Sequence, residues 1–121
     1  MNRDFQHNDL MAILDSIDDA VVKLDAHGQF VAMNRAAITI YQRLGLDPQQ
    51  MKGKSVWEVF PDLKGTIVER ELQSVIEEHM QTSFEFYYPK DQHWYETKGY
   101  SIPPGAVLVF RDITDKKAAT S

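Results

Sequence analysis

The predicted strand at residues 106–112 constrains the fold more than any other segment of this chain. Its first five residues carry no polar side chain on either face of a strand, and a strand of that kind is covered on both sides. The segments before it have the pattern of hairpin partners, and an antiparallel sheet usually leaves one face in water. We therefore expect a second cover for this strand: another segment of the chain, a partner subunit, or both.

The run closes on Asp112, Ile113 and Thr114, and a charged, helix-prone segment follows at 115–119. The Asp112 carboxylate can accept hydrogen bonds from the backbone amides that follow it, and Thr114 is a good N-cap. We expect these three residues to fix the angle at which an exit helix leaves the sheet, as in a signal-transmitting module. The alternative is an ordinary junction between a strand and a linker.

Composition narrows the class of protein. The 121 residues suffice for one domain, and a net charge of −5 disfavours a nucleic-acid partner. With no cysteine, the chain has no disulfides, thiolate metal ligands, cysteine nucleophile or cysteinyl photoadduct. No apolar run approaches the roughly 20 residues of a membrane span, and the N-terminus lacks the apolar core of a signal peptide. We expect a soluble, cytoplasmic segment of a longer protein.

Hydrophobic periodicity predicts an α+β architecture. Two strands precede a group of helices and three strands follow it, which favours one antiparallel sheet with helices on one face. We divide the chain into an N-terminal amphipathic helix (1–19), a core (20–113) and the start of an exit helix or linker (114–121). The predicted strands are 20–25, 29–34, 83–88, 93–102 and 106–112, and the predicted helices are 8–17, 35–44, 47–51, 55–60 and 63–80.

This order of elements resembles the PAS domain fold, and five segments strengthen the resemblance. They are LDSIDDAVVKLD (14–25), GQFVAMNRAA (28–37), MKGKS (51–55), WYE (94–96) and RDITDKK (111–117). The last two look like the final strands and exit motif of bacterial sensor PAS domains, including those of sensor histidine kinases. The resemblance implies a strand order of 2-1-5-4-3, which makes 106–112 the central strand. One of its faces would then meet a pocket under the helices.

The resemblance raises the question of cofactors. The chain has four histidines, His7, His27, His79 and His93, and in haem PAS domains the ligand lies on the long helix. His79 is near the end of that predicted helix between acidic neighbours, so we expect a surface histidine and no haem. A cysteinyl flavin is excluded. Redox flavin stacked on Trp57 stays open, beside the simpler expectation that Trp57 packs in the core.

We expect a non-covalent small-molecule pocket at the inner face of the fourth strand. The resemblance directs the smaller side chains of that strand inward, opposite aromatic residues of the helices and of the third strand, and apolar walls with few polar groups are typical of ligand sites. The alternative is a closed core filled by the aromatic rings. The candidate ligand-binding residues are Tyr41, Trp57, Phe84, Phe86, Tyr95, Thr97 and Gly99.

The opposite face of the sheet is the predicted dimer interface. Trp94 and Tyr100 point to it, and an apolar patch of that kind is unusual on a monomer. We expect the N-terminal helix, through Leu10, Ile13, Leu14 and Ile17, to seat there and to form a homodimer. In the alternative, that helix folds back within one chain and covers the patch alone.

Catalytic patterns are missing from the sequence: it has no Ser/His/Asp arrangement, no phosphate-binding glycine loop and no His-rich metal spacing. We therefore expect a non-enzymatic sensory domain of a bacterial signalling protein, with a histidine kinase as the first candidate for the parent. The alternative is a ligand-free dimerisation or interaction module of a transcription activator or cyclic-dinucleotide enzyme. A small α+β enzyme is the third hypothesis.

Overall fold

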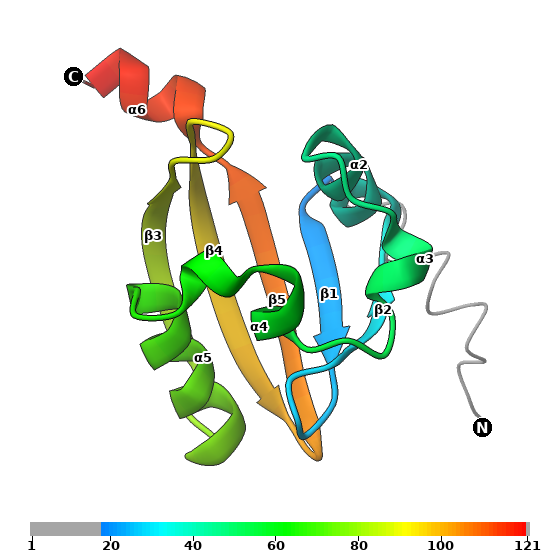
Figure 1. Ribbon diagram of the computed structural model, residues 1–121. Coiled ribbons are helices and arrows are strands. Elements are labelled where there is room, and N and C mark those ends of the chain that lie inside the picture. Colours follow the sequence, from blue (N-terminus) through cyan, green and yellow to red (C-terminus); the bar gives the residue numbers. More distant parts are fainter. Residues whose placement is uncertain (1–17, 121) are drawn as a thin grey trace, which may run out of the picture.

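A computed structural model describes residues 18–120 of the protein, built around a five-stranded antiparallel sheet (Figure 1). The spatial order is β2-β1-β5-β4-β3, which confirms the predicted fold and the central place of the last strand. The strands are β1 (Ala20–Leu24), β2 (Phe30–Met33), β3 (Thr82–Tyr88), β4 (His93–Ile102) and β5 (Gly105–Asp112).

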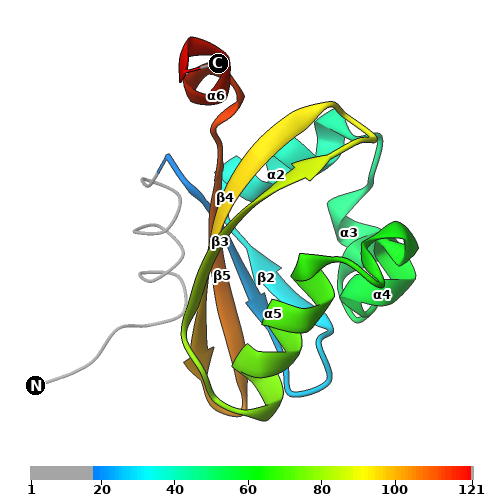
Figure 2. The same cartoon turned by 90° about the vertical axis from the view of Figure 1, so that its left-hand side faces the viewer.

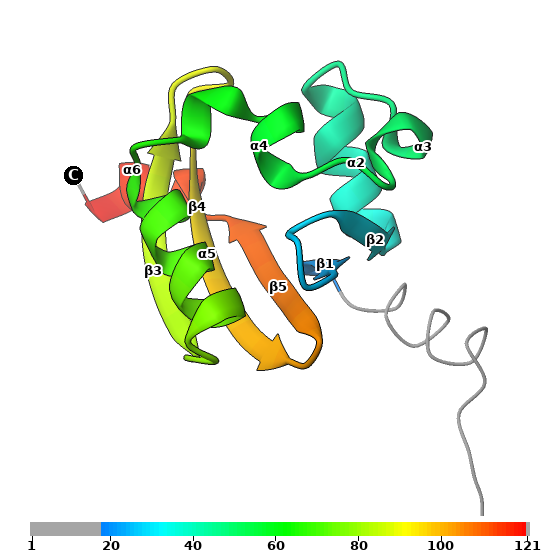
Figure 3. The same cartoon turned by 60° about the horizontal axis from the view of Figure 1, so that its bottom comes forward.

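The helices between β2 and β3 cover one face of this sheet (Figure 2). They are α2 (Arg35–Arg43), α3 (Pro48–Met51), α4 (Val56–Val59), the 3-10 turn η1 (Pro61–Leu63) and α5 (Ile67–Glu77). The helix α6 (Thr114–Thr120) instead leaves the end of β5, away from that layer (Figures 1 and 3). Within residues 18–120, no helix is long and apolar enough to cross a membrane. The predicted helix 8–17 lies outside the described residues.

Asn34 ties the first hairpin to the first helix. Its side-chain Oδ1 accepts from the backbone N–H of Val21 at 2.9 Å and of Ala37 at 3.1 Å, and its Nδ2 donates to the carbonyl of Asp19 at 3.0 Å. Asn34 is thus the N-cap of α2. Because Asn34 is fully buried, the cap also fixes where α2 crosses the sheet.

The turn between β1 and β2 is a tight hairpin turn. Gly28 has φ +74°, a left-handed conformation that glycine adopts without steric cost. The Asp25 carboxylate accepts from the backbone N–H of His27 at 2.8 Å and of Gln29 at 3.0 Å. These bonds close the hairpin tightly.

The longest helix is shorter than the predicted 63–80. It begins at Ile67, where the Thr66 side chain accepts from the N–H of Val68 at 3.2 Å, and it ends at Glu77. The preceding residues form the separate turn η1. The predicted helix began too early because the helical spacing of apolar residues also includes Leu63. In the structure, Leu63 belongs to η1, and the N-cap at Thr66 starts a separate helix.

Side chains alternate between the two faces of the central strand. Leu108 and Phe110 face the helices, while Val107 and Val109 lie on the outer face and are half-buried. The expectation that a partner or another segment covers the outer face stays a prediction, because the proposed cover is outside the described residues.

Candidate functional site

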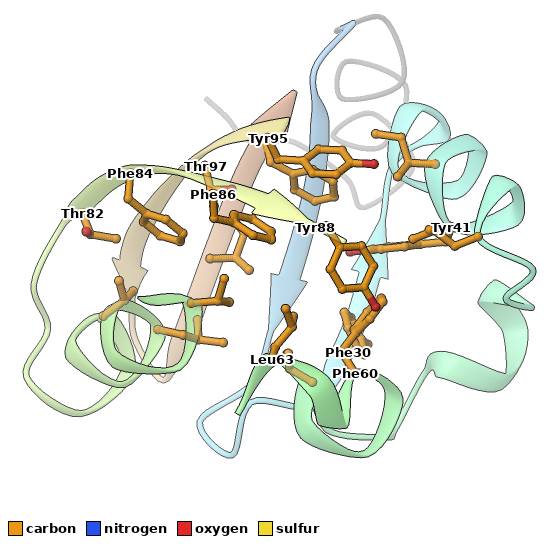
Figure 4. A pocket seen from close by; sticks show the side chains of 18 residues that line it. Phe30, Tyr41, Phe60, Leu63, Thr82, Phe84, Phe86, Tyr88, Tyr95 and Thr97 are labelled. Carbon is orange, nitrogen blue, oxygen red and sulfur yellow. The ribbon is translucent and has the colours of Figure 1, made fainter. Parts of the chain in front are cut away.

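A cavity of about 90 Å³ lies between the inner face of the sheet and the helices (Figure 4). Its wall is almost entirely apolar, and none of its side chains is an acid, a histidine, a lysine or an arginine. The lining residues are Phe30, Ile40, Tyr41, Leu44, Val56, Phe60, Leu63, Val68, Leu72, Val75, Thr82, Phe84, Phe86, Tyr88, Tyr95, Thr97, Leu108 and Phe110.

Strand alternation and ring packing build this wall. Phe84, Phe86 and Tyr88 are every second residue of β3, and they face inward together. The Phe86 and Tyr95 ring centroids are 5.9 Å apart, and those of Tyr95 and Phe110 are 6.2 Å apart. These separations are typical of favourable aromatic pairs, so the rings support one another around the cavity.

Tyr41, Phe84, Phe86, Tyr95 and Thr97, five of the seven candidate ligand-binding residues, lie on the wall. Trp57 does not, although it packs against the core. It lies on the short helix α4 beside Val56, and successive helical residues point about 100° apart, so Val56 faces the cavity in its place.

Gly99 is also absent from the cavity wall, because helix α5 occupies the space in front of it. A Cβ at Gly99 would stand 2.9 Å from Val75 Cγ2 and 3.1 Å from Thr82 Cγ2. Gly99 does share the inward face with Tyr95 and Thr97, as predicted. Its lack of a side chain allows close packing of helix on sheet instead of leaving room for a ligand.

The three tyrosine hydroxyls of the wall differ in their partners. Tyr88 donates to Asp62 Oδ1 at 3.3 Å, and Tyr95 donates to Asp91 and accepts from Arg43 Nη2 at 2.8 Å. The Tyr41 hydroxyl makes no hydrogen bond with any residue in the described range 18–120, although only 6% of that residue is exposed. Burial and the neighbouring Tyr95 raise the pKa of Tyr41, so its phenol is protonated at neutral pH.

Polar groups gather where the Tyr95 hydroxyl leaves the cavity, and we call Arg43, Asp91, His93 and Asp112 the polar cluster. Arg43 Nη2 lies 3.5 Å from Asp91 Oδ2 and 3.4 Å from Asp112 Oδ2. The His93 ring contacts the Asp112 carboxylate through Nδ1. Tyr95 thus has its ring on the cavity wall and its hydroxyl in the polar cluster.

The polar cluster continues into the start of α6. Asp112 Oδ1 accepts from the Thr114 N–H at 2.9 Å and from its hydroxyl at 2.5 Å. Burial opposes ionisation of Asp112, but the bonds from Thr114 and His93 outweigh it and hold the pKa of Asp112 below its usual range.

Thr114 acts differently from the predicted N-cap. It is the first residue of α6, and its hydroxyl oxygen accepts from the Trp94 N–H at 2.9 Å. The Ile113 N–H donates to the Trp94 carbonyl at 2.8 Å. The exit motif is therefore bonded to β4 as well as to its own helix.

Comparison with known families assigns this fold. The family model described as PAS fold matches residues 14–118, most of the chain. The chain belongs to the PAS fold family. No curated protein matches it significantly.

Several solved structures are similar to this PAS domain. A PAS domain from Colwellia psychrerythraea is 23% identical with a TM-score of 0.62, and the match covers 89% of this chain and 97% of that one. The photoactive yellow protein domain of the sensor histidine kinase Ppr from Rhodospirillum centenum is 14% identical with a TM-score of 0.64, covering 84% and 91%. The PAS domain of the Cronobacter turicensis quorum-sensing receptor RpfR, in complex with C12:0, is 21% identical with a TM-score of 0.61, covering 81% and 96%.

Several wall residues of this PAS domain were not among the sequence candidates. Tyr88 continues the alternation of Phe84 and Phe86, so the strand pattern contained the signal for it. Phe60 and Leu63 lie at the end of α4 and in η1. Short turns of that kind have no periodicity from which an inward side chain can be predicted.

The predicted dimer residues are divided between the outer face and the undescribed segment. Tyr100 is half-buried on the outer face, opposite Val107. Trp94 lies beside the exit helix, with Lys117 Nζ 4.6 Å from its ring centroid. Leu10, Ile13, Leu14 and Ile17 are outside the described residues.

None of the histidines that the structure describes lines the cavity, although the His93 ring stacks on the wall residue Tyr95 with centroids 6.3 Å apart. His27 is in the first hairpin turn, His93 is in the polar cluster, and the exposed His79 follows α5 with Nδ1 3.2 Å from Ser101 Oγ. Across residues 18–120, no group of three or more His, Asp or Glu side chains is arranged to hold a metal ion.

Proposed function

We propose that this PAS domain binds a small molecule in its cavity and transmits the binding event through α6 to an attached output domain. The observation that carries the proposal is the position of Tyr95. Its ring lines the cavity, its hydroxyl joins the polar cluster, and its backbone is the direct partner of Asp112 across β4 and β5.

Few contacts connect the cavity to the start of α6. A ligand that shifts the Tyr95 ring changes the positions available to its hydroxyl and hence to Arg43 and Asp91. Arg43 also contacts Asp112, which holds the first turn of α6 through Thr114. A switch of this kind needs only a few kcal/mol of differential binding between two positions of the helix.

Similar proteins support the proposal at the level of the fold. The RpfR PAS domain, in complex with C12:0, and the domain from the sensor histidine kinase Ppr have this architecture. We propose a sensor histidine kinase as the parent protein, with no catalytic activity in this domain. We also propose a cytoplasmic homodimer that uses the outer sheet face, including Trp94 and Tyr100, together with the N-terminal segment.

Native mass spectrometry of the protein purified from cells tests the proposal, after its absorption above 300 nm has been recorded. We expect a bound small mass that disappears on denaturation. The Thr97→Phe variant, which fills the cavity, should lose that mass, whereas the control Lys98→Leu on the outer face should retain it. A bare mass, above all as a dimer, would favour the ligand-free interaction module, for which the small cavity volume is the supporting observation.

A further inference from the structure

Tyr41 is the one tyrosine of the described cavity wall whose hydroxyl has no protein partner. Its ring reaches from α2 into the cavity, with the hydroxyl pointing toward the side chains of the opposite wall (Figure 4). The ring packs against Phe60 at 5.8 Å and Phe110 at 6.0 Å between centroids. These contacts hold the phenol in place, so the hydroxyl has a fixed direction.

A buried hydroxyl without a partner is unusual in a folded protein. Native structures pair nearly all of their buried polar groups, and each exception calls for an explanation. Tyr88 and Tyr95 follow this rule on the same wall by turning their hydroxyls to Asp62 and Asp91. Tyr41 is an exception: its hydroxyl is buried, points into the cavity (Figure 4) and has no partner among the described residues.

We infer that the Tyr41 hydroxyl is the hydrogen-bonding anchor of the cavity, and that its ligand is a neutral, largely apolar molecule with one hydrogen-bond acceptor, such as a carbonyl oxygen. This inference rests on the proposed function, because it names the ligand class of the same site. The phenol donates its proton to the acceptor, and the rest of the molecule contacts aromatic and aliphatic side chains.

The surroundings of Tyr41 argue for a neutral ligand. No side chain of the described wall carries a charge, and the guanidinium of Arg43, which contacts the Tyr95 hydroxyl, is also paired with Asp91 and Asp112. Burial raises the pKa of Tyr41, which means that this environment disfavours a negative charge on the phenol oxygen. The same desolvation would disfavour a carboxylate placed beside it.

The wall argues equally for an apolar body with few polar groups. Apart from Tyr41, the polar side-chain atoms of the wall belong to Thr82, Thr97, Tyr88 and Tyr95, and three of these have protein partners. Thr82 contacts Glu71, and the two tyrosines are bonded as described. A ligand with several polar groups would leave most of them without partners, at a cost in affinity.

Three probes of similar size separate these features. Acetophenone has an aromatic body and one acceptor, ethylbenzene has nearly the same shape without the acceptor, and benzoate has a charged head. Their binding to the wild type and to Tyr41→Phe is measured by ¹H–¹⁵N NMR titration. Tyr41→Phe removes only the hydroxyl, and Tyr87→Phe, on the exposed outer face of β3, is the matched control.

We expect Tyr41→Phe to weaken acetophenone binding by about three- to tenfold, the range of one neutral hydrogen bond, with ethylbenzene binding unchanged or tighter. Benzoate should bind at least tenfold more weakly than acetophenone. Tyr87→Phe should change none of these constants. A thermal melt without probe should show Tyr41→Phe folded and at least as stable as the wild type, since it loses an unpaired buried hydroxyl.

Different results overturn different statements. If Tyr41→Phe changes the affinities for acetophenone and ethylbenzene equally, Tyr41 is not the hydrogen-bonding anchor, although the cavity still binds ligands. Preferential binding of benzoate would overturn the neutral ligand class. If neither neutral probe shifts the amide signals of the wall residues in the wild type, both the anchor and the proposed ligand-binding function are wrong.

Discussion

At the scale of single residues, Gly99 determines how closely α5 approaches the sheet. The helix places Val75 directly over this position, and Val75 is completely buried. A β-branched side chain has little freedom to move aside. The contact therefore depends on the absence of a methyl group on β4.

Replacing Gly99 with alanine should destabilise the domain by about 1–3 kcal/mol, because overpacking a close contact forces the helix or the strand to shift. Urea denaturation followed by circular dichroism measures the change. Lys98→Ala is the control, since Lys98 is the next residue of the same strand and is exposed. Equal losses in the two variants would show that the glycine has no special packing role.

Residue patterns predicted the faces of the strands but not what stands opposite them. Alternation grouped Tyr95, Thr97 and Gly99 on one face of the strand, and the resemblance to PAS domains directed that face inward, where the structure has it. It could not tell that Val75 fills the space at Gly99 while the space at Thr97 stays open, because that depends on the position of α5 in three dimensions. For the same reason, the sequence could not predict that the Tyr41 hydroxyl would have no protein partner.

At the scale of elements, the start of α6 is bonded to both neighbouring strands of the sheet. Asp112 of β5 accepts from Thr114, and Thr114 accepts from Trp94 of β4. Lys117 extends over the Trp94 ring and pairs with Glu85 of β3 at 2.6 Å. Trp94 is therefore a natural reporter of the position of this helix.

The Asp112→Ala variant should loosen α6, because the Thr114 N–H and hydroxyl lose their acceptor. We expect hydrogen exchange of the α6 amides to become faster while exchange in α5 is unchanged. In a Trp57→Phe background, which leaves Trp94 as the single tryptophan, the emission maximum should move to longer wavelength. Thr114→Ser, which retains the hydroxyl, should behave like the parent, and unchanged exchange in Asp112→Ala would contradict this role.

Element boundaries were predictable where a single residue fixes them. The predicted helix starts at 35 and 47 lie within one residue of the starts of α2 and α3, where the side chains of Asn34 and Asp47 cap the helices. The prediction was wrong at the start of α5, since the apolar spacing runs through η1 and conceals the cap at Thr66. The path of α4 and η1 shapes part of the cavity wall, so this part of the site could not be derived from the sequence.

At the scale of the whole molecule, the lowered pKa of Asp112 links stability to pH. A carboxyl group with a pKa lowered by folding stabilises the native state above its unfolded value of about 3.9, and this contribution is lost as the pH falls through the folded value. We expect the free energy of unfolding to drop below about pH 4, and to drop less steeply in Asp112→Asn. Urea denaturation at pH 7, 4 and 3 measures both curves.

The control for this prediction is Asp18→Asn, which removes the same charge from an exposed position. It should follow the wild-type curve. Parallel curves for Asp112→Asn and the wild type would show that the bonds from Thr114 and His93 do not favour the ionised carboxylate.

The overall architecture was the most predictable level. The run at 106–110, apolar on both faces, predicted a strand covered on both sides, and the resemblance of the segments around it supplied the strand order and the central place of that strand. Predicting how side chains pack requires knowing how distant segments are placed relative to one another. The layers of helix and sheet can instead be predicted from the hydrophobic pattern within each segment.

The position of β5 between β1 and β4 also has a consequence for how the protein is made. During synthesis, β1 and β2 emerge first, but β1 has one edge without a partner until β5 follows. The β3–β4 hairpin likewise cannot join the earlier half of the sheet before then. The nascent chain therefore exposes a strand edge that can aggregate until the last strand emerges from the ribosome and closes the sheet.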